Sequence, residues 1–246
     1  MRGLYAVMWR ELLVLRKRLW KTLAAGSISP VLYLTAFGWG IGRNVTMGSG
    51  NYLHFIIPGI IALTVMNNSF SGVATPLNIS RHYSKTFEEY LIAPVSNLCL
   101  ALGKAAGGIL RGLTASAVVL VVSLLFKVHL HLNLWFFITL FVSSFAFASM
   151  GVLAGMVIRS HEDQSNFNTF VLLPMSFLSG TFFHLDLLPT PLASFIKLLP
   201  LTHVAIALRS IATDQVTPYA SLGVITLFAL IFFLAAVFSI NRYREI

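Results

Sequence analysis

Long apolar runs separated by short polar links dominate the sequence. Three of these runs, 113–126, 132–158 and 218–240, contain no charged residue. About 20 apolar residues in a helix are needed to cross a hydrocarbon core that is roughly 30 Å thick. Because backbone groups in lipid must form hydrogen bonds within their own segment, the runs predict membrane-spanning helices. They are continuously apolar, whereas the strands of a transmembrane β-barrel would alternate.

The positions of the runs predict an all-α integral membrane protein with six spanning helices. The spans are expected at 22–42, 53–77, 104–126, 134–158, 166–183 and 219–240. Pro30 is expected to bend the first span. A further apolar stretch, 185–210, is interrupted by three prolines and is too broken for a full crossing. No repeat divides the chain, so residues 1–246 are predicted to form one membrane domain.

Residues 1–21 are predicted to form an amphipathic helix on the membrane surface. Apolar side chains recur there at helical spacing, and two tryptophans suit the headgroup region. The apolar positions are Leu4, Met8, Leu12, Leu15 and Leu19, and the tryptophans are Trp9 and Trp20. Six Lys and Arg residues lie in the same segment, and no short apolar core with a cleavage site follows it. A cleavable signal peptide is therefore not expected.

The composition and the charge distribution agree with a membrane protein. Hydrophobic residues make up 57% of the chain and charged residues 10%, whereas soluble domains carry about 25% charged residues. With the N-terminus inside, 13 of the 17 Lys and Arg residues fall on the inner side, so both termini are expected in the cytoplasm. The net charge of +9 is attributed to these loops, because no nucleic-acid-binding motif is present. A single cysteine, Cys99, excludes an intrachain disulfide and a cysteine-based metal site.

Two short motifs resemble nucleotide-binding loops, but neither is complete. Segment 38–42 (GWGIG) has Val45 where a dinucleotide loop needs its third glycine, and close helix packing explains its glycines better. Residues 103–104 (Gly-Lys) resemble the end of a phosphate loop, but Leu98 replaces its first glycine and Ala105 its Ser or Thr. ATP binding by this chain is therefore not expected. If transport is driven by ATP, the ATPase is another polypeptide.

Other candidate sites are weak, and neither a catalytic residue nor a metal site is predicted. His129 and His131 could face a metal from a loop, but no carboxylate or further histidine lies nearby in the sequence, which favours an interfacial pair. Ser179 and His203 lack a hydrolase motif. Arg111 lies about one to two turns inside the third span, where snorkelling to the cytoplasmic interface is favoured over an ion path. A proton- or sodium-coupled carrier is poorly supported.

Segment 81–94 is predicted to form a short amphipathic helix in the cytoplasm between the second and third spans. Thr86 and Glu89 have the spacing of a capping box, and Pro94 ends the helix. The apolar face consists of Phe87, Tyr90 and Leu91, at positions i, i+3 and i+4. Two interpretations stay open. The helix rests on lipid, or its exposed aromatics anchor in a partner while Glu88 and Glu89 meet a basic rim.

The chain resembles the membrane subunit of type-2 ABC exporters, a group that includes permeases for polysaccharides, drugs and nodulation factors. The likeness follows nearly the whole chain, beginning with the basic amphipathic helix. Its further pieces are Pro30-Val31-Leu32-Tyr33, Gly38-x-Gly40-x-Gly42, 55–60 (FIIPGI), Glu88-Glu89 with Ala93-Pro94, 147–151 (FASMG), 177–183 (FLSGTFF), Leu187-Leu188-Pro189 and 199–203 (LPLTH). Their order and spacing carry the resemblance. His184 departs from it, because such proteins often have a proline at that position.

The resemblance implies a dimer of this chain with two ABC ATPase subunits docked beneath it. Segment 81–94 would be the coupling helix that contacts the ATPase, and 185–210 a re-entrant segment that closes the outer end. The implied docking residues are Lys85, Phe87, Glu88, Glu89, Tyr90 and Leu91. ATP and Mg²⁺ would bind to the ATPase, and this chain would hold no cofactor. A bacterial inner membrane is the implied location, with the lipid bilayer and the ATPase as partners and no nucleic acid.

By the same resemblance, the first, second and fifth spans line a transport route at the dimer interface. Polar side chains in these spans agree, since polar groups at membrane depth must avoid lipid. The candidates are Tyr33, Asn67, Asn68, Ser71, Asn168, Ser176 and Ser179. An uncharged lining suits an amphiphilic, lipid-linked, polysaccharide or drug-like cargo better than a small ion. The expected function is the non-catalytic permease subunit of an ATP-driven exporter, and the alternative is a membrane scaffold protein without transport activity.

Overall fold

Helices make up nearly all of the structure, a computed structural model that describes residues 2–37, 46–47, 50–126, 128, 130–185, 188–214 and 217–244. The helices are α1 (Arg2–Thr35), α2 (Tyr52–His82), α3 (Glu88–Ile92), α4 (Asn97–Leu125), α5 (Leu134–Val157), α6 (His161–Phe167), the π-helix η2 (Asn168–Leu172), α7 (Leu173–Leu178), α8 (Thr190–Ile196), α9 (Pro200–Ala212) and α10 (Tyr219–Arg244). Two short antiparallel strands, β1 (Thr46–Met47) and β2 (Gly50–Asn51), join α1 to α2. The helical fold class is confirmed for the part of the chain described.

Four of the described helices, α2, α4, α5 and α10, are long and apolar enough to cross a membrane. They coincide with the predicted second, third, fourth and sixth spans. Within the stretch 185–210, α8 and α9 meet at 92°, and they add a fifth candidate if the bent pair counts as one span. The predicted first span, 22–42, begins within α1, which ends at Thr35. Its last residues, 38–42, lie outside the described part of the chain. The fifth falls on α6, η2 and α7, each too short for a crossing. The count of six stays a prediction.

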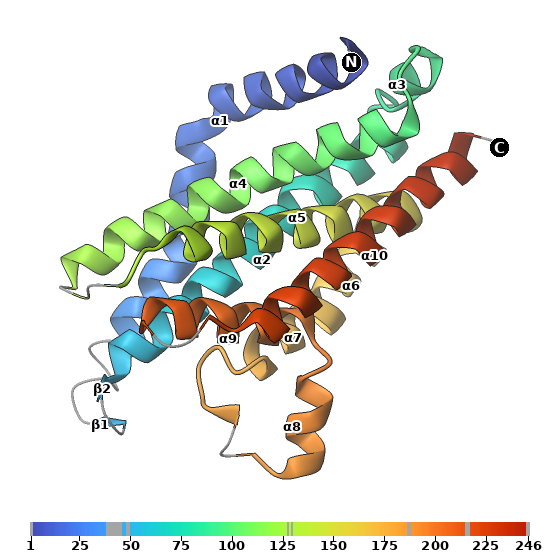
Figure 1. Cartoon of the computed structure of the whole chain (residues 1–246). Coiled ribbons are helices and arrows are strands. Elements are labelled where there is room, and N and C mark those ends of the chain that lie inside the picture. The colour runs from blue at the N-terminus through green and yellow to red at the C-terminus, as the bar shows by residue number, and fades with distance from the viewer. Residues whose placement is uncertain are drawn as a thin grey trace.

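The central helix of the bundle is α2, which packs against α1, α4, α5 and α9 (Figure 1). Glycines bring its neighbours close. A Cβ on Gly112 of α4 would lie 2.0 Å from the Ser69 hydroxyl oxygen, and one on Gly151 of α5 would lie 2.6 Å from the Phe70 carbonyl oxygen. Side chains do not fit at such distances, so these two glycines set how closely α4 and α5 approach α2.

Replacing Gly151 with alanine is expected to destabilise the bundle. The new methyl group would overlap the Phe70 carbonyl, which as backbone cannot rotate aside, and overpacking of a dense interior costs about 1–3 kcal/mol. Gly223 of α10 is the matched control, because nothing lies within 4 Å of a Cβ there. The gain in helix propensity is the same at both sites. Thermal unfolding in one detergent compares the two variants, and equal midpoints would contradict this packing.

Side-chain caps explain where two of the helices begin. The Asn133 side-chain oxygen accepts a hydrogen bond from the Phe136 backbone N–H at 3.0 Å, and the Ser160 hydroxyl accepts one from the Asp163 N–H at 3.0 Å. Each cap satisfies an N–H group that has no partner within the first turn. The polar links before α5 and α6 therefore end at these residues.

The predicted surface helix and residues 22–35 of the predicted first span form one continuous helix, α1, which changes direction along its length (Figure 1). Its N-terminal half runs alongside the first part of α4 (Figure 1), where a Cβ on Gly103 would lie 2.4 Å from Val7 and one on Gly107 would lie 2.9 Å from Glu11. Val7 and Leu15 are buried, whereas Met8 and Leu12 of the predicted apolar stripe are 38% and 43% exposed. Trp20 is 85% exposed. Exposed apolar and indole side chains on this half suit the headgroup region of a membrane.

Both described ends of the chain lie at the same end of the bundle, together with α3 (Figure 1). The Arg244 guanidinium of α10 donates a hydrogen bond to the Val95 carbonyl at 3.1 Å. A Cβ on Gly3 of α1 would lie 3.2 Å from the Val95 side chain. The start of α1, the link before α4 and the end of α10 therefore meet in one place.

Candidate functional site

Polar side chains line two adjoining cavities beside α2, and we call these two cavities the polar cleft. Their volumes are about 280 and 320 Å³. Both are lined by Tyr33, Leu63, Asn67 and Ser71. The first adds Asn168, Thr169, Leu172, Leu173, Ser176 and Phe177. The second adds Gly26, Ser29, Pro30, Thr64 and Asn68.

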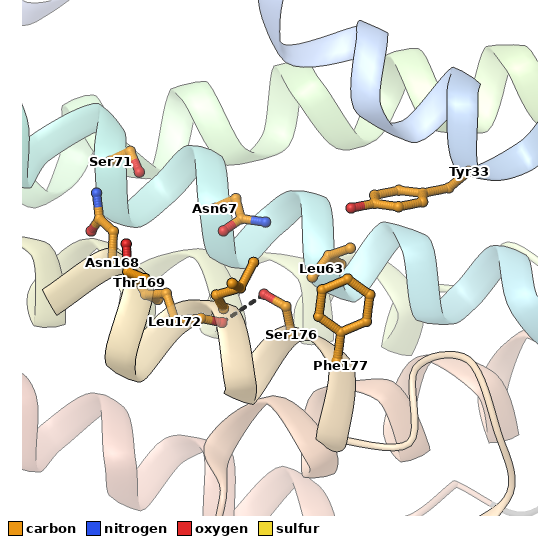
Figure 2. A pocket seen from close by; sticks show the side chains of 10 residues that line it. Tyr33, Leu63, Asn67, Ser71, Asn168, Thr169, Leu172, Ser176 and Phe177 are labelled. Carbon is orange, nitrogen blue, oxygen red and sulfur yellow. Dashed lines mark hydrogen bonds between the residues drawn. The ribbon is translucent and has the colours of Figure 1, made fainter. Parts of the chain in front are cut away.

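Figure 2 shows that the polar cleft lies between α2 and the segment formed by η2 and α7. Asn67 and Ser71 project from α2, one turn apart, and Asn168 faces Ser71 from η2. Tyr33 of α1 and Phe177 of α7 stand at the other end of the view. The π-helical turn of η2 is an irregularity of a kind that is frequent at functional sites.

Six of the seven side chains predicted for the transport route line the polar cleft. They are Tyr33, Asn67, Asn68, Ser71, Asn168 and Ser176. Ser179 is not among the residues that line it; its side chain is 1% exposed, and its hydroxyl donates a hydrogen bond to the Met175 carbonyl at 2.6 Å. Three further polar residues line the polar cleft that were not predicted: Ser29, Thr64 and Thr169. Ser29 lies one helical turn before Tyr33, and this spacing was the available signal.

Amides, hydroxyls and aromatic rings give the polar cleft its chemistry. Among the described residues that line it, none is charged. Asn and Ser side chains offer hydrogen-bond donors and acceptors, and Tyr33 and Phe177 offer apolar surface. Such a surface can contact a molecule that is part polar and part apolar. Its described lining contains no carboxylate and no histidine.

Aromatic rings close one end of the polar cleft. The ring centre of Phe182 lies 5.5 Å from that of Tyr33, 5.2 Å from that of Phe37 and 5.7 Å from that of Phe177. The Phe182 carbonyl accepts a hydrogen bond from the Tyr52 hydroxyl at 3.1 Å. We call these four rings, Tyr33, Phe37, Phe177 and Phe182, the aromatic closure.

Arg209 of α9 holds the loop that carries Phe182. Its Nε donates to the Phe55 carbonyl at 3.1 Å, and its Nη2 donates to the carbonyls of Gly180 and Thr181 at 3.0 and 3.4 Å. The guanidinium carbon also lies 3.7 Å from the ring centre of Phe55. Carbonyls just past the end of α7 have no helical partner, so Arg209 satisfies them and joins α2, α7 and α9.

The segment around α3 forms the second candidate surface. We call residues 83–96 the α3 platform. The predicted helix 81–94 is shorter in the structure, since α2 continues to His82 and α3 begins only at Glu88. The predicted capping box is wrong, because α3 has no side-chain cap and the Thr86 hydroxyl lies 3.1 Å from the Ser84 hydroxyl instead. A turn in which Lys85 has a φ of 53° precedes α3. The helix therefore begins at Glu88, two residues after Thr86.

Two aromatic residues that were predicted to be exposed anchors face the protein instead. Phe87 is 1% exposed and packs edge-on against Tyr243 of α10, with 5.6 Å between ring centres. Tyr90 is partly buried, its hydroxyl accepts a hydrogen bond from Arg10, and the Lys104 Nζ lies 4.8 Å from its ring centre. That prediction is wrong because the apolar face of α3 packs against this chain's own α1, α4 and α10. The side chain of Leu91 lies outside the described part.

The exposed side of the α3 platform carries charges and two large side chains. Lys85, Glu88 and Glu89 are exposed. Ile92 is 86% exposed and Tyr83 is 67% exposed. Ile92 and Tyr83 were not among the predicted docking residues, although Ile92 lies four residues after Glu88 and so on the same helical face.

Arg81 ties the start of the α3 platform to the rest of the bundle. Its Nη1 donates to the carbonyls of Gly155 and Met156, at the end of α5, at 2.7 and 2.5 Å. Its guanidinium carbon lies 4.5 Å from the ring centre of Tyr243. Beside it, the Asn78 amide donates to the Ile158 carbonyl at 3.1 Å. These contacts join α2, α5 and α10 next to the platform.

The remaining candidate residues have local partners or lie outside the described part. The Arg111 Nη2 lies 4.0 Å from the Glu11 carboxylate of α1, so its charge has a counterion within the protein. His203 Nε2 lies 2.8 Å from the Lys197 carbonyl. Within the described ranges no group of three potential metal ligands occurs. His131 is exposed, and His129 lies outside those ranges.

The chain is similar to known proteins over most of its length. The profile of the family described as "ABC-2 type transporter" matches residues 2–213. The inner membrane transport permease YadH of Escherichia coli (strain K12) is 31% identical over 233 residues, which cover 92% of this chain and 90% of YadH. Nodulation protein J of Rhizobium leguminosarum bv. viciae is 26% identical over 234 residues, which cover 91% of this chain and 90% of that protein. Both candidate surfaces lie within the matched residues.

Proposed function

Because the chain belongs to the ABC-2 type transporter family, we propose that it is the permease subunit of an ATP-driven exporter whose ATPase is a separate polypeptide. The observation that carries this proposal is the pairing of an uncharged polar cleft with a charged platform at the end of the same helix, α2. The cleft suits passage of an amphiphilic molecule, and the platform suits docking of a soluble partner. ATP and Mg²⁺ would bind to that partner.

The polar cleft is the proposed transport route. Asn67, Ser71 and Asn168 would contact the polar part of a lipid-linked, polysaccharide or drug-like cargo, and Tyr33 and Phe177 its apolar part. Without a buried carboxylate or histidine in its described lining, the cleft has no group to couple transport to protons. Energy from ATP hydrolysis therefore fits this site better than an ion gradient.

The second copy of this chain is proposed to pack against the side on which the polar cleft opens. Large apolar side chains near the cleft are exposed: Ile28 and Leu32 of α1 are each 60% exposed, and Phe170 of η2 is 75% exposed. Lipid would have to meet the amides of the cleft if this side were left uncovered, which is costly. A second copy would cover them and enclose a route between the two chains.

The α3 platform is the proposed ATPase contact. A movement of α3 would displace α1 and α4 through Tyr90, because Tyr90 contacts Arg10 and Lys104. It would displace α10 through Phe87, because Phe87 packs against Tyr243. The convergence of both described chain ends beside α3 supports placing this end in the cytoplasm (Figure 1). The opposite end would then carry α8 and α9 as a re-entrant pair that closes the route.

Single-cysteine labelling tests the proposed route without knowledge of the cargo. In a Cys99→Ser background, Ser71→Cys and Asn168→Cys are expected to react with a hydrophilic maleimide at least about tenfold faster than Leu124→Cys and Leu230→Cys. The thiolate is the reactive form and requires water, and Leu124 and Leu230 are 62% and 52% exposed on apolar surface proposed to face lipid. Reconstituted protein is labelled and weighed by mass spectrometry. Equal rates at all four positions would rule out a water-accessible route in the cleft.

A membrane scaffold protein without transport activity is the alternative. The exposed charges of the α3 platform fit this alternative as well, whereas the polar cleft has no role in it. The neighbouring reading frames offer a simple discriminator. An adjacent gene for an ATPase with a phosphate loop favours transport, and neighbours that encode only membrane or envelope assembly proteins favour the scaffold.

A further inference from the structure

A third cavity, about 650 Å³ in volume, lies between α1, the C-terminal part of α2, the turn before α3, and α4. Four basic side chains line it, Arg10, Lys17, Lys104 and Arg111, against one acidic side chain, Glu11. Serine and threonine hydroxyls complete the polar lining. We call it the basic cavity. It is distinct from the polar cleft, with which it shares no lining residue.

The single carboxylate of the basic cavity is shared between two cations. Lys104 Nζ lies 2.7 Å from Glu11 Oε1, and Arg111 Nη2 lies 4.0 Å from Glu11 Oε2. The side chains of all three are 11–13% exposed. Arg10 donates a hydrogen bond to the Tyr90 hydroxyl, and Lys17 is an exposed lining residue of the cavity. Four positive charges therefore face one negative charge where water is partly excluded, which favours binding of an anion.

The surroundings of the basic cavity indicate the source of that anion. The cavity lies beneath the N-terminal half of α1, where Trp9 and Trp20 are 51% and 85% exposed. Tyr5 stacks on Trp9 with 6.0 Å between ring centres. Exposed indole and phenol rings on a basic amphipathic helix are typical of headgroup depth, where lipid phosphates are abundant. We propose that the basic cavity binds the phosphate group of an anionic phospholipid.

A bound phosphate would have a defined structural effect. It would lie among cations contributed by α1 and α4 and so reduce their mutual repulsion, and the hydroxyls of Ser84 and Thr86 would donate hydrogen bonds to it. This would hold α1 against α4 next to the α3 platform. The inference requires that the chain lies in a membrane. It does not require that an ATPase docks on the α3 platform.

Lipid binding to charge-matched variants tests the inference. The full chain, purified in neutral detergent, is titrated with phosphatidylglycerol, phosphatidylcholine or inorganic phosphate, and bound ligand is counted by native mass spectrometry. Each basic group near a headgroup contributes about fivefold to affinity, so Arg10→Gln/Lys17→Gln is expected to bind phosphatidylglycerol about 30-fold more weakly than wild type. The control Arg16→Gln/Arg242→Gln removes the same charge from exposed side chains outside the cavity and is expected to bind like wild type.

The outcomes are separable. Loss of phosphatidylglycerol binding in the cavity variant but not in the control supports the site. Equal binding of phosphatidylcholine, or equal loss in both double variants, overturns it. Saturation by inorganic phosphate with an affinity equal to that for the lipid overturns the lipid source and leaves a site for free phosphate. If Arg10→Gln/Lys17→Gln does not fold, Lys17→Gln alone decides, with an expected fivefold loss, because Lys17 is exposed and its removal leaves the packing unchanged.

Discussion

Reversing the two acids of α3, as Glu88→Lys/Glu89→Lys, is expected to abolish stable association with the proposed ABC ATPase and to stop the proposed export. Both side chains are exposed on the α3 platform, so the change does not disturb the bundle. Opposite the basic rim proposed for the ATPase, two charge reversals would turn attraction into repulsion, and the expected loss of affinity is on the order of 100-fold or more. Co-purification of the epitope-tagged chain with its ATPase measures the effect.

Two further variants separate docking from general charge effects. Glu88→Gln/Glu89→Gln removes attraction without adding repulsion and is expected to weaken association by a smaller factor. Glu162→Lys/Asp163→Lys makes the same reversal in the first turn of α6, where both acids are exposed and the preceding turn contacts α2 through Asn78. It is expected to keep most of the association. Equal loss from the two reversals would show that the α3 platform is not the specific contact.

Replacing Arg209 with methionine is expected to open the polar cleft at the end formed by the aromatic closure and to destabilise the protein by about 3 kcal/mol. Hydrogen bonds from a charged donor contribute roughly 1.5–3 kcal/mol each, partly offset by the desolvation that a buried guanidinium costs. The variant leaves the carbonyls of Phe55, Gly180 and Thr181 without this donor. The loop that carries Phe182 should then loosen, and the aromatic closure with it.

Thermal unfolding and labelling measure the two consequences of Arg209→Met. A midpoint about 6–12 °C lower is expected in detergent, together with faster maleimide labelling of Ser71→Cys from the side on which α8 and α9 lie. Lys197→Met is the control, because it removes a basic side chain that is exposed at the α8–α9 turn. A stable Arg209→Met protein with unchanged labelling would show that Arg209 does not hold the closure.

Hydropathy predicted the four longest apolar helices, because lipid demands about 20 apolar residues in a row and few sequences meet that demand by chance. It was weaker where the chain departs from one straight helix. In α1 the charged segment and the first predicted span share one helix, and no breaker separates them. The predicted fifth span is divided among α6, η2 and α7, and the π-helical turn between them has no recognised residue pattern.

The polar cleft was largely predictable and the α3 platform was only partly so, for one physical reason. The family resemblance implied that these spans line a route, and the polar side chains Asn67 and Asn168 agreed with it, because polar groups in a membrane span must avoid lipid. An apolar face on a short helix can be covered by a partner or by the chain itself. Phe87 packs against Tyr243, which is 156 residues further along the chain, and no local pattern reports that contact.

Arg209 shows a second limit of sequence reasoning. Its hydrogen-bond partners are backbone carbonyls, and any residue provides one, so no pairing pattern marks them. The signal that was available is the residue itself, an arginine inside the apolar stretch 200–212. A charged residue in such a stretch is costly unless it is satisfied by the protein, and it therefore indicates a structural or functional contact.

The most direct test of the central proposal is to purify the chain from its native membranes in mild detergent and to weigh the intact complex by native mass spectrometry. We predict two copies of this chain with two copies of an ABC ATPase, and loss of the ATPase from the Glu88→Lys/Glu89→Lys variant. A complex that contains no protein with a phosphate loop, recovered under conditions that keep other membrane complexes intact, would contradict the proposal.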